Sequence, residues 1–135
     1  MEQNSYLFDH SALYSCKLHF TFDLFGSSIH SLAPNFCMSS SYRARRLADC
    51  PPLPALSVAV PPWNRLLALL SEVAADHANI KGRILLITPM WPAQPWWPLL
   101  IRLSQGKLVT FPGNPWMTRA RKRVPHKAVG IWIGQ

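Results

Sequence analysis

The sequence predicts an α/β protein with a partial parallel sheet, flanking helices and long Pro/Ser-rich loops. Two short apolar runs, at 56–60 and 84–88, stand on either side of a helical repeat at 64–77. The chain has 135 residues, a length that suits one domain with a single hydrophobic core. Its 13 prolines interrupt regular structure often, so short elements with long connections are expected.

The first 54 residues are predicted to hold a helical segment, a strand and a loop. Apolar residues within 1–18 have spacings compatible with a short amphipathic helix. The aromatic run HFTFDLF at 19–25 is predicted to form a strand that ends at Gly26, with Asp23 near its carboxyl end. Residues 31–54 are rich in Ser, Pro and Arg and have no apolar period, which predicts a loop.

The central residues are predicted to form a βαβ unit. LSVAV at 56–60 is a short apolar strand that Pro61 and Pro62 terminate. Residues 64–77 repeat apolar side chains with the period of a helix, and Lys81-Gly82 follows as a stop signal. ILLIT at 84–88 is a continuous apolar run, typical of a strand covered on both faces. This order predicts two parallel strands with a right-handed crossover.

The remaining residues are predicted to hold a helix, a short strand and a tail. A helix at 95–103 is expected if Pro98 lies in its first turn, where a missing amide proton costs little. Residues 108–111 are the last predicted strand. Residues 113–135 are interpreted as a basic C-terminal tail, in which RARKR precedes a small apolar end, AVGIWIG. The predicted division is an N-terminal segment at 1–18, a module at 19–112 and this tail.

The charge of the chain is strongly basic. There are 14 Lys and Arg against 6 Asp and Glu, a formal charge of +8. A positive field of this size attracts polyanions, so DNA or RNA is the leading class of partner, although the charge could also serve solubility alone. For RARKR the alternatives to phosphate contact are a nuclear-import signal and a solvated linker. The candidate nucleic-acid-binding residues are Arg43, Arg45, Arg46, Arg119, Arg121, Lys122 and Arg123.

Several other classes of protein are not indicated. The three cysteines form no C-x-x-C pair and the five histidines fall on different predicted elements, so neither a metal site nor a disulfide framework is expected. Reduced thiols predict an intracellular protein, without deciding between nucleus and cytoplasm. No apolar run reaches the length of a membrane span, and residues 1–10 lack a secretory signal. Walker, G-x-G-x-x-G and G-x-S-x-G motifs are missing.

Two segments together resemble one family: FDLFGSSIHSLAPNF at 22–36, and PPWNRLLALL through ILLITPMWPAQPWWPLL at 61–100. They resemble DIRS-type, tyrosine-recombinase retrotransposons, in the polyprotein region between the ribonuclease H domain and the recombinase. The resemblance covers about residues 18–112 and implies a polyprotein fragment whose partners include neighbouring retroelement domains. Its most specific motif is I-x-P-x-W-P-x-Q-P-W-W/F-P-L-L, matched here by Pro89, Trp91, Pro92, Gln94, Pro95, Trp96, Trp97, Pro98, Leu99 and Leu100.

This polyprotein region is itself similar to phage-type DNA N6-adenine methyltransferases, which are Rossmann-like enzymes with an N/D-P-P-Y motif and S-adenosylmethionine as cofactor. In such enzymes the acidic or amide side chain accepts the hydrogens of the adenine amino group, and the aromatic ring stacks on a flipped base. The matching residues here are Val60, Pro61, Pro62 and Trp63. Because Val60 has no acceptor, the resemblance implies a relic motif, without catalysis, on a partial Rossmann-like sheet.

Three features have both a functional and a structural interpretation. Asp23 could hold a cofactor hydroxyl or amine, or act as a turn carboxylate. The Pro61-Pro62-Trp63 segment is either a relic base-stacking site or a rigid turn with a core tryptophan, and the turn is favoured. The cluster of Trp91, Trp96 and Trp97 could be a stacking platform for single-stranded nucleic acid, but a hydrophobic lid over the sheet edge is favoured.

The favoured function is a non-catalytic retrotransposon fragment with non-specific nucleic-acid binding, no cofactor and no metal. One alternative is an S-adenosylmethionine-dependent DNA adenine methyltransferase with a degenerate motif, against which Val60 and the missing glycine-rich loop both count. A domesticated basic protein that binds DNA or RNA, and a translated genomic remnant without function, are the remaining alternatives.

Overall fold

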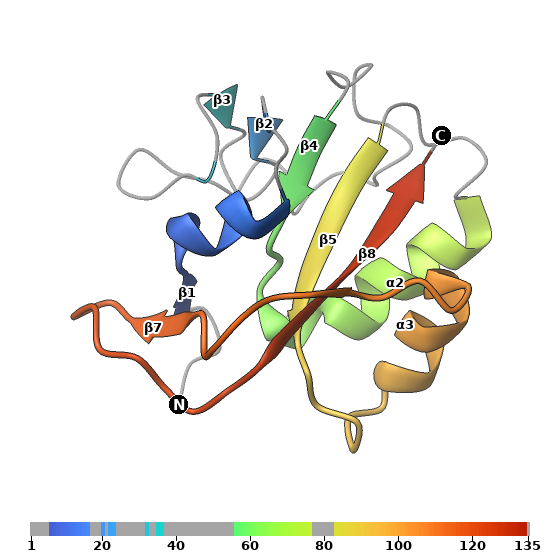
Figure 1. The fold of residues 1–135 in the computed structure, drawn as a ribbon. Coiled ribbons are helices and arrows are strands. Elements are labelled where there is room, and N and C mark those ends of the chain that lie inside the picture. Colours follow the sequence, from blue (N-terminus) through green and yellow to red (C-terminus); the bar gives the residue numbers. More distant parts are fainter. Residues whose placement is uncertain are drawn as a thin grey trace.

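The computed structural model describes residues 6–16, 20, 22–23, 32, 35–36, 56–76 and 83–134. Within these residues the fold is mixed α/β, with two sheets and two α-helices (Figure 1). In chain order the elements are β1 (Tyr6–Phe8), the 3-10 helix η2 (His10–Cys16), β2 (Phe22–Asp23), β3 (Asn35–Phe36), β4 (Leu56–Ala59), the 3-10 helix η4 (Trp63–Arg65), α2 (Leu66–Asp76), β5 (Arg83–Pro89), α3 (Trp97–Ser104), β6 (Val109–Thr110), β7 (Trp116–Thr118) and β8 (Ala128–Gly134).

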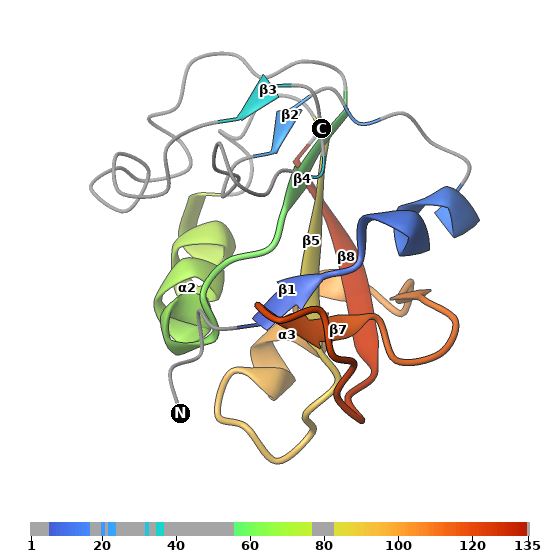
Figure 2. The ribbon, with the colours of Figure 1, turned by 90° about the vertical axis from the view of Figure 1, so that its left-hand side faces the viewer.

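The predicted unit of two parallel strands and a helix is confirmed. Strands β4 and β5 pair in parallel, with Ser57 opposite Ile84, and α2 lies between them in the chain. The helix follows from its apolar repeat, because one stripe of α2 is buried while Leu67, outside the stripe, is 47% exposed. Helix α2 lies on one face of the sheet and η2 on the other (Figure 2). The buried stripe consists of Leu66, Leu69, Leu70 and Val73.

Helix α3 is also confirmed, one or two residues later than predicted. It starts after Trp96 and carries Pro98 in its first turn, where proline is tolerated. It ends where Gln105 and Gly106 adopt positive φ angles of 53° and 77°. The helix packs beside α2 and against β8.

The larger sheet has the strand order β3-β2-β4-β5-β8-β6. Strands β3, β2, β4 and β5 run parallel, whereas β8 runs antiparallel to both of its neighbours, β5 and β6. The sheet is therefore mixed: the parallel pairing that the sequence predicts holds for β3, β2, β4 and β5, whereas β8 departs from it.

Strand β8 is the main departure from the prediction, which places 113–135 in a basic tail. All seven residues of β8 pair with β5, from Ala128 opposite Pro89 to Gly134 opposite Arg83. Gly130 permits this close packing, because a Cβ atom there would lie 2.9 Å from the Cδ1 atom of Leu85. The apolar end AVGIWIG is thus an inner strand of the sheet.

The second sheet joins the first described strand to the C-terminal part of the chain. Strands β1 and β7 pair antiparallel, with Phe8 opposite Trp116. The sequence predicts an amphipathic helix within 1–18, but the structure has a strand, then η2, whose start is fixed by the Asp9 carboxylate accepting the Ser11 backbone N–H at 3.0 Å. Residues 10–16 are thus helical, as η2, whereas residues 6–8 form a strand because their pairing partner, β7, lies in the C-terminal part of the chain.

One hydrophobic core spans the three segments into which the sequence is divided. The same buried cluster contains Phe8 from the N-terminal segment, Leu86 and Leu100 from the central module, and Trp116 and Ile131 from the C-terminal residues. The described residues therefore form a single packed unit, to which residues beyond 112 contribute both core side chains and strands.

Candidate functional site

Two predicted sites lie at the ends of neighbouring strands of the larger sheet. From β2 the chain continues to β3 on one side, whereas from β4 it continues to β5 on the other. Open α/β sheets bind ligands outside the carboxyl ends of the strands at such a reversal. Asp23 ends β2, where it pairs with Val58, and Val60 to Trp63 follow β4 directly. The structure thus brings Asp23 and the Pro61-Pro62-Trp63 segment to the same end of two adjacent strands.

Asp23 is a buried carboxylate that accepts a hydrogen bond from the backbone. Its side chain is 3% exposed, and its Oδ2 atom accepts the backbone N–H of Leu32 at 2.8 Å. This bond joins the end of β2 to a residue nine positions later. A buried carboxylate that accepts a backbone N–H of its own chain matches the structural interpretation of Asp23, a turn carboxylate.

The Pro61-Pro62-Trp63 segment forms a rigid transition from strand to helix. Pro62 has φ −56° and ψ 136°, and its carbonyl accepts the backbone N–H of Arg65 at 2.9 Å, which starts η4. Val60 is half-buried and carries only carbon atoms in its side chain. This turn therefore offers no side-chain acceptor at the position where an adenine amino group would need one.

Trp63 lies inside an aromatic cluster, which consists of Tyr6, Trp63, Trp91, Trp116 and His126. The Tyr6 ring stacks on Trp63 with 4.9 Å between centroids and 20° between planes. Trp91 and Trp116 meet Trp63 edge to face, at 4.6 Å and 5.1 Å between centroids. Trp63 is only 5% exposed as a result. Its ring packs in the core, and Tyr6 takes the stacked position that a base would need.

None of the three tryptophans of the most specific motif is fully exposed. Trp91 packs on Trp63 and on His126, the latter with 5.2 Å between ring centroids. Trp96 is 4% exposed, and Trp97 is half-buried with its ring tilted 57° from that of Trp96. A platform for successive bases needs exposed ring faces, so this arrangement favours the hydrophobic lid.

The run RARKR at 119–123, called the basic turn from here on, is the loop of a tight hairpin. The backbone N–H of Thr118 donates to the carbonyl of Lys122 at 2.8 Å, and that of Arg121 donates to the carbonyl of Thr118 at 2.9 Å. Arg121 has φ 66°, the left-handed conformation that closes three-residue hairpin loops. Met117 and Arg123 then form a bridge. The basic turn is therefore ordered, in contrast to the predicted tail.

The cations of the basic turn face solvent. Arg119, Arg121, Lys122 and Arg123 are all exposed, and Lys127 is exposed close to them in sequence. The Lys127 Nζ atom donates to the Gly113 carbonyl at 3.2 Å. Five basic side chains are thus carried within nine residues by one hairpin and the segment that leads to β8.

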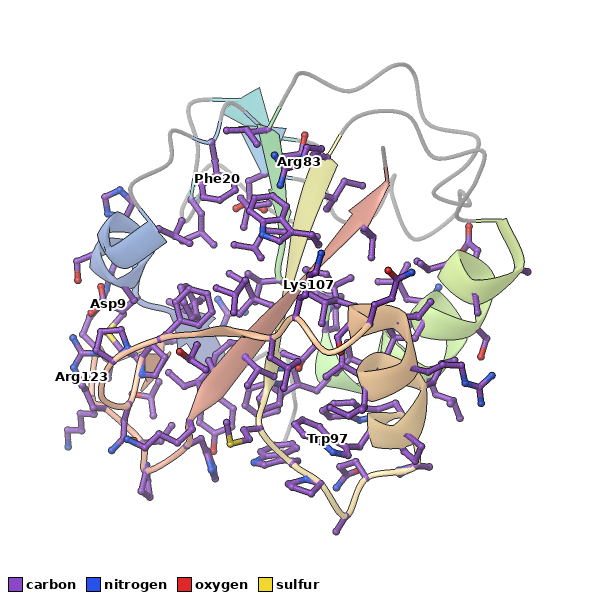
Figure 3. All side chains as sticks on the ribbon, turned by 45° about the vertical axis from the view of Figure 1, so that its right-hand side comes forward. Asp9, Phe20, Arg83, Trp97, Lys107 and Arg123 are labelled. Carbon is purple, nitrogen blue, oxygen red and sulfur yellow. The ribbon has the colours of Figure 1, made fainter. Side chains whose placement is uncertain are left out.

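One carboxylate reaches the basic turn from the N-terminal segment. Arg123 forms an ion pair with Asp9, and its Nη1 atom donates to the Asn114 carbonyl at 3.0 Å. Figure 3 shows Asp9 and Arg123 at one corner of the molecule, away from Arg83 and Lys107. Burial alone would raise the pKa of Asp9, but hydrogen bonds from Arg123 and Ser11 outweigh it and hold the pKa below the ordinary value of 3.8.

The basic turn belongs to a long stretch of sequence without carboxylates. Asp76 is the last acidic residue, so residues 77–135 contain no Asp or Glu. The same stretch contains nine basic residues: Lys81, Arg83, Arg102, Lys107, Arg119, Arg121, Lys122, Arg123 and Lys127. No carboxylate of the same stretch can therefore neutralise the basic turn, which concentrates positive potential there.

The remaining predicted binding residues, Arg43, Arg45 and Arg46, lie outside the described residues. In the part of the chain that is described, no three His, Cys, Asp or Glu side chains come together as a metal site. Among the same residues, no helix is long and apolar enough to cross a membrane.

Comparison of the chain with protein-family models finds no match, and comparison with curated proteins finds none either.

Two residues associated with the basic turn, Asp9 and Lys127, are missing from the sequence-based candidates. The absence of acidic residues after Asp76 is visible in the sequence and would have drawn attention to Lys127. Asp9 has no such signal, because its partner Arg123 is 114 positions away and only the pairing of β1 with β7 brings them together.

Proposed function

We propose that this chain is a non-catalytic module of retrotransposon origin that binds DNA or RNA through its basic turn. The observation that carries the proposal is the exposure of four cations on one ordered hairpin in a carboxylate-free stretch. Binding of this kind is directed at phosphates, so it is strong at low salt and indifferent to base sequence. Neighbouring retroelement domains are the other partners in this proposal.

The absence of catalysis in the proposal rests on the end of β4. Val60 supplies no acceptor for an exocyclic amine, and the ring of Trp63 is covered by Tyr6. A deaminase or methyltransferase that acts on a base must instead hold that base in an open pocket. The side chains around Trp63 fill this space with rings of the chain itself.

A second candidate function is an S-adenosylmethionine-dependent adenine methyltransferase on a Rossmann-like sheet. It is favoured by one observation, the placement of Asp23 and Pro61-Pro62-Trp63 at the reversal between β2 and β4. In that case Asp23 would hold the cofactor, and β1 would have to leave Trp63 for a base to enter. Calorimetric titration with S-adenosylmethionine tests it, since micromolar binding would restore the enzyme as the favoured function.

The first function is tested by fluorescence anisotropy with short labelled DNA and RNA, single-stranded and duplex, across a range of salt concentrations. A variant with Arg119, Arg121 and Lys122 changed to alanine should lose most of its affinity. The slope of log affinity against log salt should fall by about 2 to 3, since each lost phosphate contact contributes slightly less than one.

The matched control removes three cations that lie outside the basic turn, in η4, in α3 and in the loop after α3. A variant with Arg65, Arg102 and Lys107 changed to alanine has the same net charge but keeps the basic turn, and its affinity should stay near that of the wild type. Equal losses in both variants would mean that net charge, and no particular surface, attracts the nucleic acid. No binding by the wild type at low salt would favour a remnant without function.

A further inference from the structure

We infer that Asp9 is a built-in competitor for the phosphates that bind the basic turn, because it occupies the guanidinium of Arg123 in the free protein. This inference rests on the proposed nucleic-acid binding and concerns its regulation. It assigns to the N-terminal segment a role that its sequence does not indicate: setting how many phosphates the basic turn can hold.

Both terminal nitrogens of Arg123 are engaged. The Nη2 atom pairs with the Asp9 Oδ2 atom, and the Nη1 atom donates to the Asn114 carbonyl at 3.0 Å. Arginine binds a phosphate best through two parallel N–H groups, so a phosphate that approaches both terminal nitrogens of Arg123 competes with the carboxylate that already accepts from one of them. A nucleic acid that displaces the Asp9 carboxylate gains this contact.

The competing carboxylate is held in place by its own neighbours. The Asp9 Oδ1 atom accepts the backbone N–H of Ser11 at 3.0 Å and the Ser11 hydroxyl at 2.9 Å. The Asp9 backbone N–H donates to the Pro115 carbonyl at 2.7 Å, directly after the paired residues of β1. An oriented carboxylate loses little entropy on meeting Arg123, so it competes at a high effective concentration.

The exposure of the two partners is unequal in a way that suits exchange. The Arg123 side chain is 55% exposed, whereas that of Asp9 is 16% exposed. A polyanion can therefore reach the guanidinium from solution, next to Arg121 and Lys122, while the carboxylate stays on the side of the fold. Phosphates bound at the outer cations would then contend with Asp9 for Arg123.

The test compares Asp9→Asn with the wild type in the same anisotropy titrations. The amide has nearly the shape of the carboxylate but cannot neutralise Arg123. We expect Asp9→Asn to bind DNA about two- to fivefold more tightly, the range of an exposed ion pair, with a salt slope steeper by about one. Adding Arg123→Ala to Asp9→Asn should abolish the gain.

Glu72→Gln is the charge control, because it removes one negative charge from α2 and leaves the basic turn intact. Its affinity should rise less than that of Asp9→Asn, and equal gains in the two variants would overturn the inference. Ser11→Ala provides a variant that keeps the Asp9 charge but loosens its orientation, and a smaller gain is expected there. Melting curves of all variants establish that each is folded.

Failure of the inference and failure of the proposed function give different results. Salt-sensitive binding by the wild type, with the same affinity in Asp9→Asn, would overturn the inference that Asp9 competes with phosphates. The proposed function would then stand. No binding by the wild type and by Asp9→Asn, both folded, would overturn the function and the inference together.

Discussion

The segment after β4 packs against one end of β7, and the basic turn begins at the other end. The first region is buried, whereas the second is exposed to solvent. At one end of β7, Trp116 packs against Trp63, a ring that is 5% exposed. At the other end, Thr118 begins the hairpin that exposes Arg121 and Lys122. A strand of three residues thus separates a closed aromatic cluster from an open cationic loop.

The difference between the two regions follows from what each kind of side chain can do with its own neighbours. Packing together lowers the free energy of the aromatic rings at the end of β4, so these rings are buried in the core. Cations cannot pack on one another without a counter-charge, and the nearby sequence supplies none, so they remain in water. Exposure of the side chains is therefore better evidence for a binding site here than resemblance to a base-binding motif.

The largest expected effect is on the closed region. Trp63→Ala should lower the free energy of unfolding by about 3 to 5 kcal/mol, because it leaves a large cavity among Tyr6, Trp91 and Trp116. Urea denaturation measures this loss, and DNA affinity of the folded fraction should stay within about twofold. Trp63→Phe should lose clearly less stability, whereas an alanine variant as stable as the wild type would contradict the core position.

The next effect concerns the ring that covers Trp63. Tyr6→Ala should cost about 2 kcal/mol, from lost stacking and from apolar area returned to water, again measured in urea. Near-ultraviolet circular dichroism should weaken with the stack, and Tyr6→Phe should preserve both quantities. A gain in affinity for single-stranded DNA in Tyr6→Ala would break the comparison, because it would show that the exposed Trp63 face accepts bases.

A smaller effect separates stability from binding at the basic turn. Arg121→Gly should raise the free energy of unfolding by about 1 kcal/mol, because glycine adopts the φ of 66° without the strain of a Cβ atom. The same variant should bind DNA more weakly, since one cation is lost. Arg121→Ala keeps the strain and loses the charge, so it should weaken binding without the gain in stability.

The smallest effect is the pH dependence of the Asp9 ion pair. Because the pKa of Asp9 in the folded protein lies below its ordinary value of 3.8, the pair stabilises the fold above that pH and loses its effect as the pH falls through the lowered pKa. Thermal melts of wild type and Asp9→Asn should differ by no more than about 1 kcal/mol at neutral pH. The difference should shrink in acid, and a difference that grows there would contradict the direction of the shift.

The parts of the fold that the sequence predicts correctly are those that local pattern determines. The leucine repeat of α2 and the continuous apolar run of β5 have lengths and periods that admit few other structures, and their neighbour β4 follows from the same reasoning. Strand β8 is missed although its run is equally apolar, because it follows a basic run and contains two glycines. Its place beside β5 depends on contacts between residues that are far apart in the sequence.

The site shows the same division between local and non-local information. The identity of the basic residues at 119–123 is read directly from the sequence, whereas their hairpin depends on pairing with β7. The occlusion of Trp63 depends on Tyr6, which the structure places in a strand and the sequence pattern places in a helix. Contacts between residues so far apart in the chain leave no periodic signal.

The inner position of β8 has a consequence for the synthesis of this chain. Translation proceeds from the N-terminus, so β4, α2 and β5 leave the ribosome before β8 does, and the edge of β5 that pairs with β8 then has no partner. At about 5 to 20 residues per second this interval lasts on the order of seconds. During that time an unpaired strand edge can join another nascent chain, so slower translation or crowded polysomes should increase aggregation. Chaperones that shield β5 until β8 arrives would then raise the yield of folded protein.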